Sequence, residues 1–214
     1  VAAYLAGDVP RAVAVQEEAL ALARALGDAQ GIADAIANLG HACQQLGDHE
    51  RADALYADAL ERYRALGDDS GVAFALTHLG RLARLRGDDH AAWNLLREAA
   101  PLAWRLGERI ALVAAFEALA PALVDRGDPA LAARLAGAAE ALRDRAGAPL
   151  PAVHHAERDD TAGRLRATLG DDGYLAALAV GRDLPADRAL ASLSPPPHAS
   201  RQVGKSARKH RRST

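Results

Sequence analysis

A glycine recurs every twenty residues along most of this chain, and this period constrains the fold more than any other feature of the sequence. Aspartate follows six of these glycines, and Glu108 follows a seventh. Glycine readily adopts the left-handed conformation that closes a helix, and aspartate accepts hydrogen bonds from the free amides of the next helix. Each such pair therefore predicts a helix end followed at once by a helix start. The glycines in phase are Gly7, Gly27, Gly47, Gly67, Gly87, Gly107, Gly127 and Gly147.

Apolar residues between these glycines recur at the spacing of an amphipathic helix. One stripe consists of Ile32, Ile36, Leu39 and Cys43, and a second stripe runs through Ala52, Leu55, Tyr56, Ala59 and Tyr63. Residues at these intervals lie on one face of a helix. Each twenty-residue unit is therefore predicted to be one helix of about four turns. The connections are short, so neighbouring helices must be antiparallel.

The units are of two alternating kinds, so the complete repeat is forty residues long. Units that begin at Asp28, Asp68 and Glu108 resemble one another, and the units between them form a second set. One repeat is then a helical hairpin. Alanine, which favours helices and is depleted from strands, makes up about a quarter of the chain and excludes an all-β fold. We expect alanines such as Ala52 and Ala92 at the close contacts between the helices of a hairpin.

The hairpins share a pattern of bulky and small positions. The first helices carry Ile36, Leu39 and Gly40, then Leu76, Leu79 and Gly80, and the second helices carry Ala52, Tyr56 and Ala59, then Ala92, Leu96 and Ala99. This pattern resembles the tetratricopeptide repeat, in a long variety found in the C-terminal regions of actinobacterial-type LuxR/SARP-like transcriptional regulators and signal-transducing ATPases. The third repeat departs from it, since Ala136 stands where the family has a large residue. The resemblance implies an all-α, right-handed superhelical solenoid of antiparallel helix pairs with C-terminal capping helices.

The period stops at Gly147, and the rest of the chain divides in two. We expect helices at 158–169 and 172–180, and a short one after Pro185, to cap the solenoid. The last segment contains six lysines and arginines and no acidic residue, and we expect it to be a disordered basic tail. The predicted organisation is a repeat region at 1–147, comprising a half-repeat at 1–27 and repeats at 28–67, 68–107 and 108–147, then capping helices at 148–193 and the tail at 194–214.

The bulk properties favour a fragment of a larger cytoplasmic protein. The chain has no methionine and begins close to a second-type helix that lacks its partner, so we expect further repeats and domains before Val1. A single cysteine, Cys43, fits a reducing compartment. The apolar runs are far shorter than the roughly 20 residues of a membrane span.

Catalytic chemistry has little support in the sequence. Gly204-Lys205-Ser206 lacks the earlier glycine and the strand of a phosphate-binding loop. His154 and His155 lack neighbouring ligands at metal-binding spacing. We therefore expect no enzyme activity, no cofactor and no metal site.

The candidate binding surface is the concave groove that first-type helices line in such a solenoid. Arg81 and Arg84 lie one helical turn apart and could together bind an acidic peptide or a terminal carboxylate. The alternative is a solvated helix face whose arginines pair with Glu117 and Asp125. By resemblance to the groove positions of the family, the candidate residues are Asp34, His41, Gln44, Gln45, Thr77, Arg81, Arg84, Glu117 and Asp125.

These features favour a non-catalytic protein–protein interaction module of a larger bacterial transcriptional regulator or ATPase. Its groove would bind a protein, a peptide or the parent's own ATPase or DNA-binding domains. Two alternatives stay open. One is a nucleic-acid-binding adaptor that uses the basic tail, although its few charges make nucleic acid an unlikely partner. The other is a stand-alone repeat scaffold. We expect no membrane partner.

Overall fold

A computed structural model describes residues 9–148 and 155–193 of the chain. Several predictions from sequence concern residues outside these ranges. They are the helix boundary at Gly7, the role of His154, the Gly204-Lys205-Ser206 segment and the disordered tail at 194–214.

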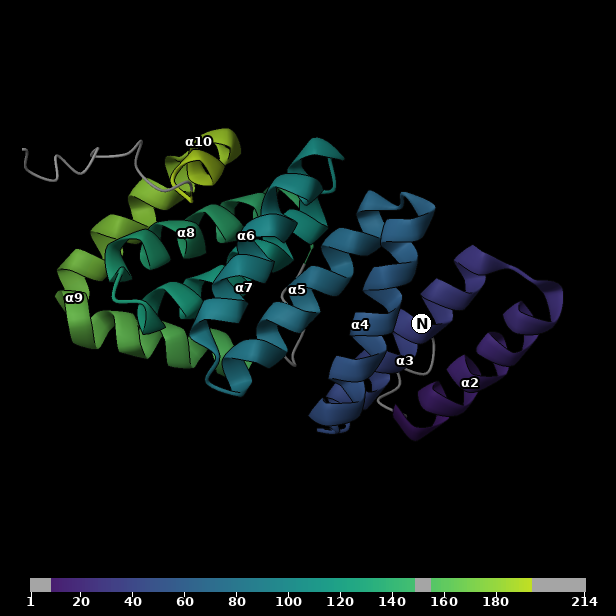
Figure 1. The fold of residues 1–214 in the computed structure, drawn as a ribbon. Coiled ribbons are helices and arrows are strands. Elements are labelled where there is room, and N and C mark those ends of the chain that lie inside the picture. The colour runs from purple at the N-terminus through teal and green to yellow at the C-terminus, as the bar shows by residue number, and fades with distance from the viewer. Residues whose placement is uncertain (1–8, 149–154, 194–214) are drawn as a thin grey trace, which may run out of the picture.

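The described residues form α-helices joined by short turns (Figure 1). From α3 to α8, each helix begins twenty residues after the previous one, as the glycine period predicts. The helices are α2 (Val9–Leu26), α3 (Ala29–Gln45), α4 (His49–Leu66), α5 (Asp69–Leu85), α6 (Asp89–Arg105), α7 (Arg109–Asp125), α8 (Pro129–Ala146), α9 (His155–Asp183) and α10 (Ala186–Ala191).

The turns form as predicted from the Gly-Asp pairs. The seven glycines of the twenty-residue period from Gly27 to Gly147 all have positive φ, between 61° and 80°. Asp28, Asp48, Asp68, Asp88 and Asp128 each accept a hydrogen bond from a backbone amide in the first turn of the following helix. Glu108 occupies the same position before α7 but makes no such bond with its side chain. Its longer side chain does not reproduce the aspartate geometry.

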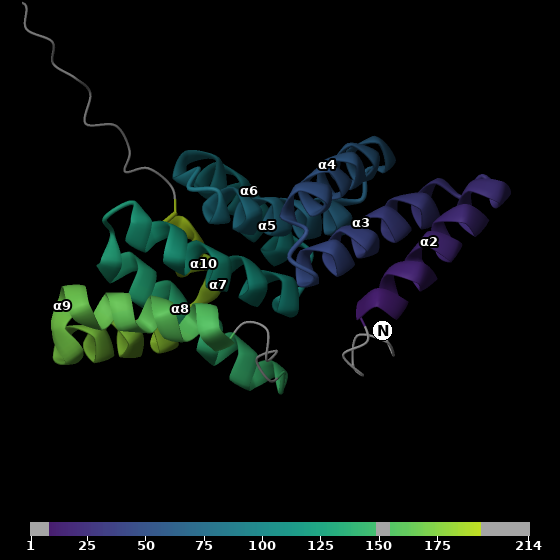
Figure 2. The ribbon, with the colours of Figure 1, turned by 90° about the horizontal axis from the view of Figure 1, so that it is seen from below.

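The helices pack as consecutive antiparallel pairs, which confirms the all-α solenoid (Figure 1). Seen from below, α4 and α6 lie on one side of α3 and α5, whereas α9 lies on the other side beside α8 (Figure 2). Ala52 and Ala92 are fully buried, as expected of small residues at close contacts. Tyr56 fills the space between α3 and α5, and Phe116 fills the core around α7.

The segment after the repeats is helical, as predicted. The helix α9 covers both expected helices, which meet at Gly170, where φ is 72° and ψ is 163°. It packs along α8, and the short α10 follows Pro185. No helix within 9–148 and 155–193 has the length and apolar character needed to cross a membrane.

Candidate interaction groove

A hollow of about 230 Å³ lies along α3 and α5. Five of the predicted groove residues line it, which are His41, Gln44, Gln45, Arg81 and Arg84. These residues come from the first-type helices α3 and α5. The hollow also contains His49 from the start of α4, His78 from α5 and Glu157 from α9.

Gln44 and His78, which line the hollow, belong to a hydrogen-bonded cluster. The Tyr56 hydroxyl donates to Oε1 of Gln44 at 3.1 Å, and Nδ1 of His78 donates to the same oxygen at 3.0 Å. The rings of Tyr56 and His78 stack with centroids 4.8 Å apart. Phe74 also packs against His78, with centroids 4.4 Å apart and ring planes tilted by 49°. The cluster therefore fixes the Gln44 amide and the His78 ring in place.

His41 lies beside this cluster as a neutral polar group. Its Nε2 lies 2.9 Å from the side-chain amide of Gln45, and its ring meets that of His78 edge to face. Burial lowers the pKa of His41, and the nearby charge of Arg81 lowers it further. Both effects disfavour the imidazolium form. The positive charge of the hollow therefore resides on its arginines rather than on His41.

Arg81 and Arg84 converge on a single carboxylate, that of Glu157 in the first turn of α9. Nη1 of Arg81 donates to Oε2 of Glu157 at 2.6 Å, and Nη2 of Arg84 donates to Oε1. The side chain of Arg81 is only 7% exposed, and a second donor, its Nη2, reaches the carbonyl of Ala114 on α7. Burial lowers the pKa of Arg81, and the Glu157 carboxylate counteracts that effect. The geometry is that of a bidentate carboxylate site formed by two arginines.

The solvated alternative for these arginines is wrong, because Arg81 is buried and neither arginine pairs with Glu117 or Asp125. Glu117 instead pairs with Arg143 of α8, and Asp125 pairs with Arg164 of α9. Their partners come from neighbouring helices that the repeat pattern alone does not place.

The two remaining candidates make hydrogen bonds within the repeats. Thr77 is buried, and its hydroxyl donates to the carbonyl of Ala73 in the preceding turn. Asp34 accepts hydrogen bonds from the Tyr63 hydroxyl at 3.0 Å and from the Gln30 amide at 3.2 Å. Neither residue lines the hollow, so the structure gathers five of the nine candidates into one site.

Sequence reasoning missed Phe74, His78 and Glu157. The first two could have been found from the sequence, because Phe74, His78, Arg81 and Leu85 recur at helical spacing on α5. Glu157 carries no such signal, since it lies beyond the repeats and 76 residues from Arg81.

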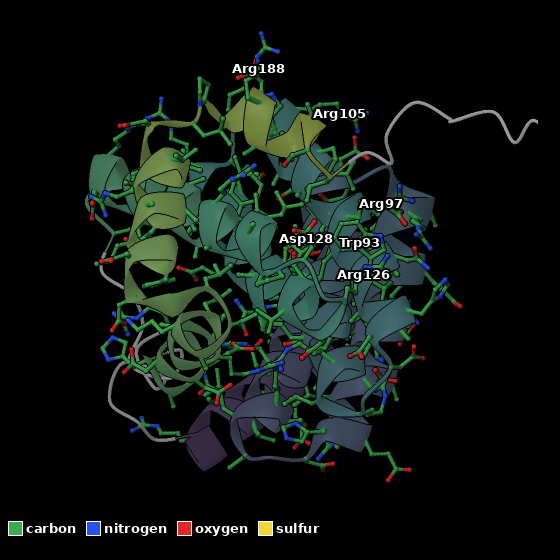
Figure 3. The ribbon with its side chains drawn as sticks, turned by 90° about the vertical axis from the view of Figure 1, so that its left-hand side faces the viewer. Trp93, Arg97, Arg105, Arg126, Asp128 and Arg188 are labelled. Atoms are coloured by element: carbon green, nitrogen blue, oxygen red, sulfur yellow. The ribbon has the colours of Figure 1, made fainter. Side chains whose placement is uncertain are left out.

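Trp93 and Cys43, which lie outside the groove, both have packing roles. Trp93 on α6 is partly buried against the core, and the guanidinium of Arg126 lies 4.7 Å from its ring centroid (Figure 3). Cys43 is 1% exposed, and burial raises the pKa of its thiol. The thiol is therefore an inert part of the core rather than a nucleophile.

Comparison with known proteins agrees with this architecture. A family model described as the tetratricopeptide repeat matches residues 1–65 and 31–105. The N-terminal half of the chain matches the tetratricopeptide repeat. Such repeats generally mediate protein–protein interaction, and they are typically non-catalytic scaffolds.

A solved structure resembles the whole chain in fold. The crystal structure of BtubC (BKLC) from P. vanneervenii superposes with a TM-score of 0.62 at 20% sequence identity. The match covers 99% of this chain and 84% of that one. The likeness at this level of identity concerns the fold alone. No curated protein matches the chain.

Proposed function

We propose that this chain is a non-catalytic interaction module whose groove along α3 and α5 binds a protein or peptide segment. The observation that carries this proposal is the convergence of Arg81 and Arg84 on one carboxylate at the edge of the hollow. Two guanidinium groups held in this way favour a carboxylate over a neutral group. The partner segment would present an acidic side chain or a chain-terminal carboxylate to them.

The neighbouring residues would supply the remaining specificity. Gln45 and His49 offer polar groups at the rim of the hollow, and Leu85 adds an apolar contact. A segment that extends from the arginines toward α3 would meet these groups in succession. Orientation by a few fixed polar groups beside an apolar surface is common in peptide-binding sites.

The groove is tested by affinity capture from the source cells with quantitative mass spectrometry. We expect a partner that the wild-type chain captures to be reduced at least about tenfold by Arg81→Gln/Arg84→Gln, a loss of roughly 1.4 kcal/mol. The control is Arg97→Gln/Arg188→Gln, which makes the same change of charge at exposed positions on α6 and α10 (Figure 3). Equal capture of every partner by the two double variants would contradict the proposal.

We also propose that the module belongs to a larger cytoplasmic bacterial transcriptional regulator or signal-transducing ATPase, whose own domains are candidate partners. The forty-residue repeat supports this, through its resemblance to the long repeats of such proteins. The coding sequence upstream of Val1 tests it. A nucleotide-binding loop and a helix-turn-helix there are expected, whereas a secretion signal would contradict the proposal.

A further inference from the structure

The two halves of α9 are attached to the repeats in different ways. The later half lies against α8 at backbone distance, because a side chain on Gly137 or Gly181 would overlap the backbone of the facing helix. Arg182 also pairs with Glu140 and Asp144 at 2.8 Å each. This half has no room to shift without losing close packing.

The earlier half, residues 155–169, is attached less closely. We call it the α9 arm. Its own Thr161 and Leu165 are buried on the side that faces the repeats, and ion pairs hold it to α5 and α7 through Glu157 and Arg164. A cavity of about 320 Å³ lies between the arm, the later half of α9 and the repeats. Ala120 and Ala136 are among the residues that line it. Ala136 occupies the repeat position at which the earlier repeats have Tyr56 and Leu96. The space beneath the arm is therefore incompletely filled.

The arm ends at a backbone position suited to a hinge. Gly170 has φ of 72° and ψ of 163°, which breaks the helix between the two halves. This conformation is accessible to glycine and strained for other residues. Rotation at Gly170 would move the arm while the later half stays on α8.

The ion pair between Glu157 and the two arginines leaves one hydrogen-bond donor of Arg84 unpaired within the described residues. Nε of Arg84 is buried and has no hydrogen-bond partner within the described residues. Buried donors are normally satisfied, so an unpaired one marks an imperfect match between the site and its occupant. Glu157 itself is 26% exposed and lies at the edge of the hollow.

We propose that the α9 arm is an internal substitute for an acidic partner, with Glu157 held in the Arg81–Arg84 site until a partner carboxylate displaces it. This inference rests on the proposed function, since it concerns the regulation of the same groove. Opening the arm alone would leave Arg81 buried without a counter-charge, which is costly. Exchange of one carboxylate for another avoids that cost. The groove therefore favours partners that bring an acidic group, and it stays closed to neutral ones.

Hydrogen exchange on the full chain tests the docking of the arm. In Glu157→Gln, we expect amides of residues 155–169 to exchange at least about tenfold faster than in wild type, and those of 172–183 to keep their rate. Asp159→Asn is the matched control, because Asp159 is exposed on the same arm and pairs only with its neighbour Arg158 among the described residues. Equal exchange in the two variants, or an equal rise in both halves of α9, would overturn the proposal.

A peptide of residues 155–169, added in trans, tests the exchange itself. Excess peptide should raise the exchange of the arm in the wild-type chain, whereas the same peptide carrying Glu157→Gln should not. Fluorescence anisotropy of the labelled peptide should show at least about tenfold tighter binding to the chain carrying Glu157→Gln than to wild type. The chain carrying Glu157→Gln and Arg81→Gln/Arg84→Gln should lose this binding.

The proposal for the α9 arm is overturned if the peptide leaves the amide hydrogen exchange of the wild-type arm unchanged. This measurement needs no variant of the chain, so it stands even where Glu157→Gln impairs folding. It also separates the two proposals, because it uses no outside partner. An arm that opens as expected in a chain with no arginine-dependent partner would count against the proposed function and leave the arm inference intact.

Discussion

A side chain on Gly80 of α5 would place its β-carbon 2.5 Å from Cγ of Leu96 on α6. The same position in the previous hairpin is Gly40, where a β-carbon would lie 3.2 Å from the Tyr56 ring. In the third hairpin the pair is Ala120 and Ala136, so a small residue on the second helix accompanies the larger one on the first. The size of the residue on the first helix thus limits the size of the side chain that fits at the facing position of the second helix.

Gly80→Ala should therefore destabilise the chain by about 1–3 kcal/mol, because Leu96 must move within a packed core. Urea unfolding followed by circular dichroism measures this. The control is Gly163→Ala, also within a helix, where a β-carbon would have no neighbour within 4 Å. That change should stabilise by up to about 1 kcal/mol through helix propensity. Similar shifts for the two variants would contradict the proposed packing.

Ala52→Leu should destabilise the hairpin of α3 and α4 by roughly 1–3 kcal/mol. Ala52 is fully buried where the two helices approach, and a larger side chain would overpack the contact. The matched variant is Ala57→Leu, an exposed position of the same helix, which should have little effect. An unchanged melting temperature for Ala52→Leu would show that the predicted register is wrong.

Glu108→Asp should stabilise the chain by about 0.5–1 kcal/mol, because aspartate is a preferred residue at the helix start. The backbone of Glu108 has φ of −81° and ψ of 82°, close to that of Asp68, which does make the cap bond. Glu61→Asp serves for comparison, since Glu61 is exposed in the middle of α4 and has no free amide to cap. Thermal melts of both variants measure the difference. A loss of stability for Glu108→Asp would contradict this account.

The stability of the chain should fall as pH is lowered below 6.5, in part through His41. Burial lowers the pKa of His41 below its ordinary value of 6.5. Between the two pKa values the unfolded chain binds a proton that the folded chain does not, so stability rises with pH there. His41→Gln should reduce this slope in urea titrations between about pH 5 and pH 7. An identical slope in the variant would contradict burial of a neutral His41.

The regular part of the fold follows from local rules. Helix ends at Gly27 or Gly67, and helix starts at Asp28 or Asp68, depend on residues that are neighbours in sequence. The burial of Ala52 and Tyr56 follows from helical spacing together with the short turns. Repetition of these signals every twenty residues makes them readable without a tertiary structure.

The residue that pairs with the groove arginines could not be predicted from local rules. The sequence identified Arg81 and Arg84 as a pair that suits a carboxylate, because their spacing is local. It gave no indication that Glu157 supplies that carboxylate, since an ion pair across 76 residues has no period and depends on how α9 returns over the repeats. That path depends on packing, through the glycine contacts of α9 with α8 and the small residues beneath the arm. Local spacing placed the two arginines side by side, and long-range packing determined which carboxylate they meet.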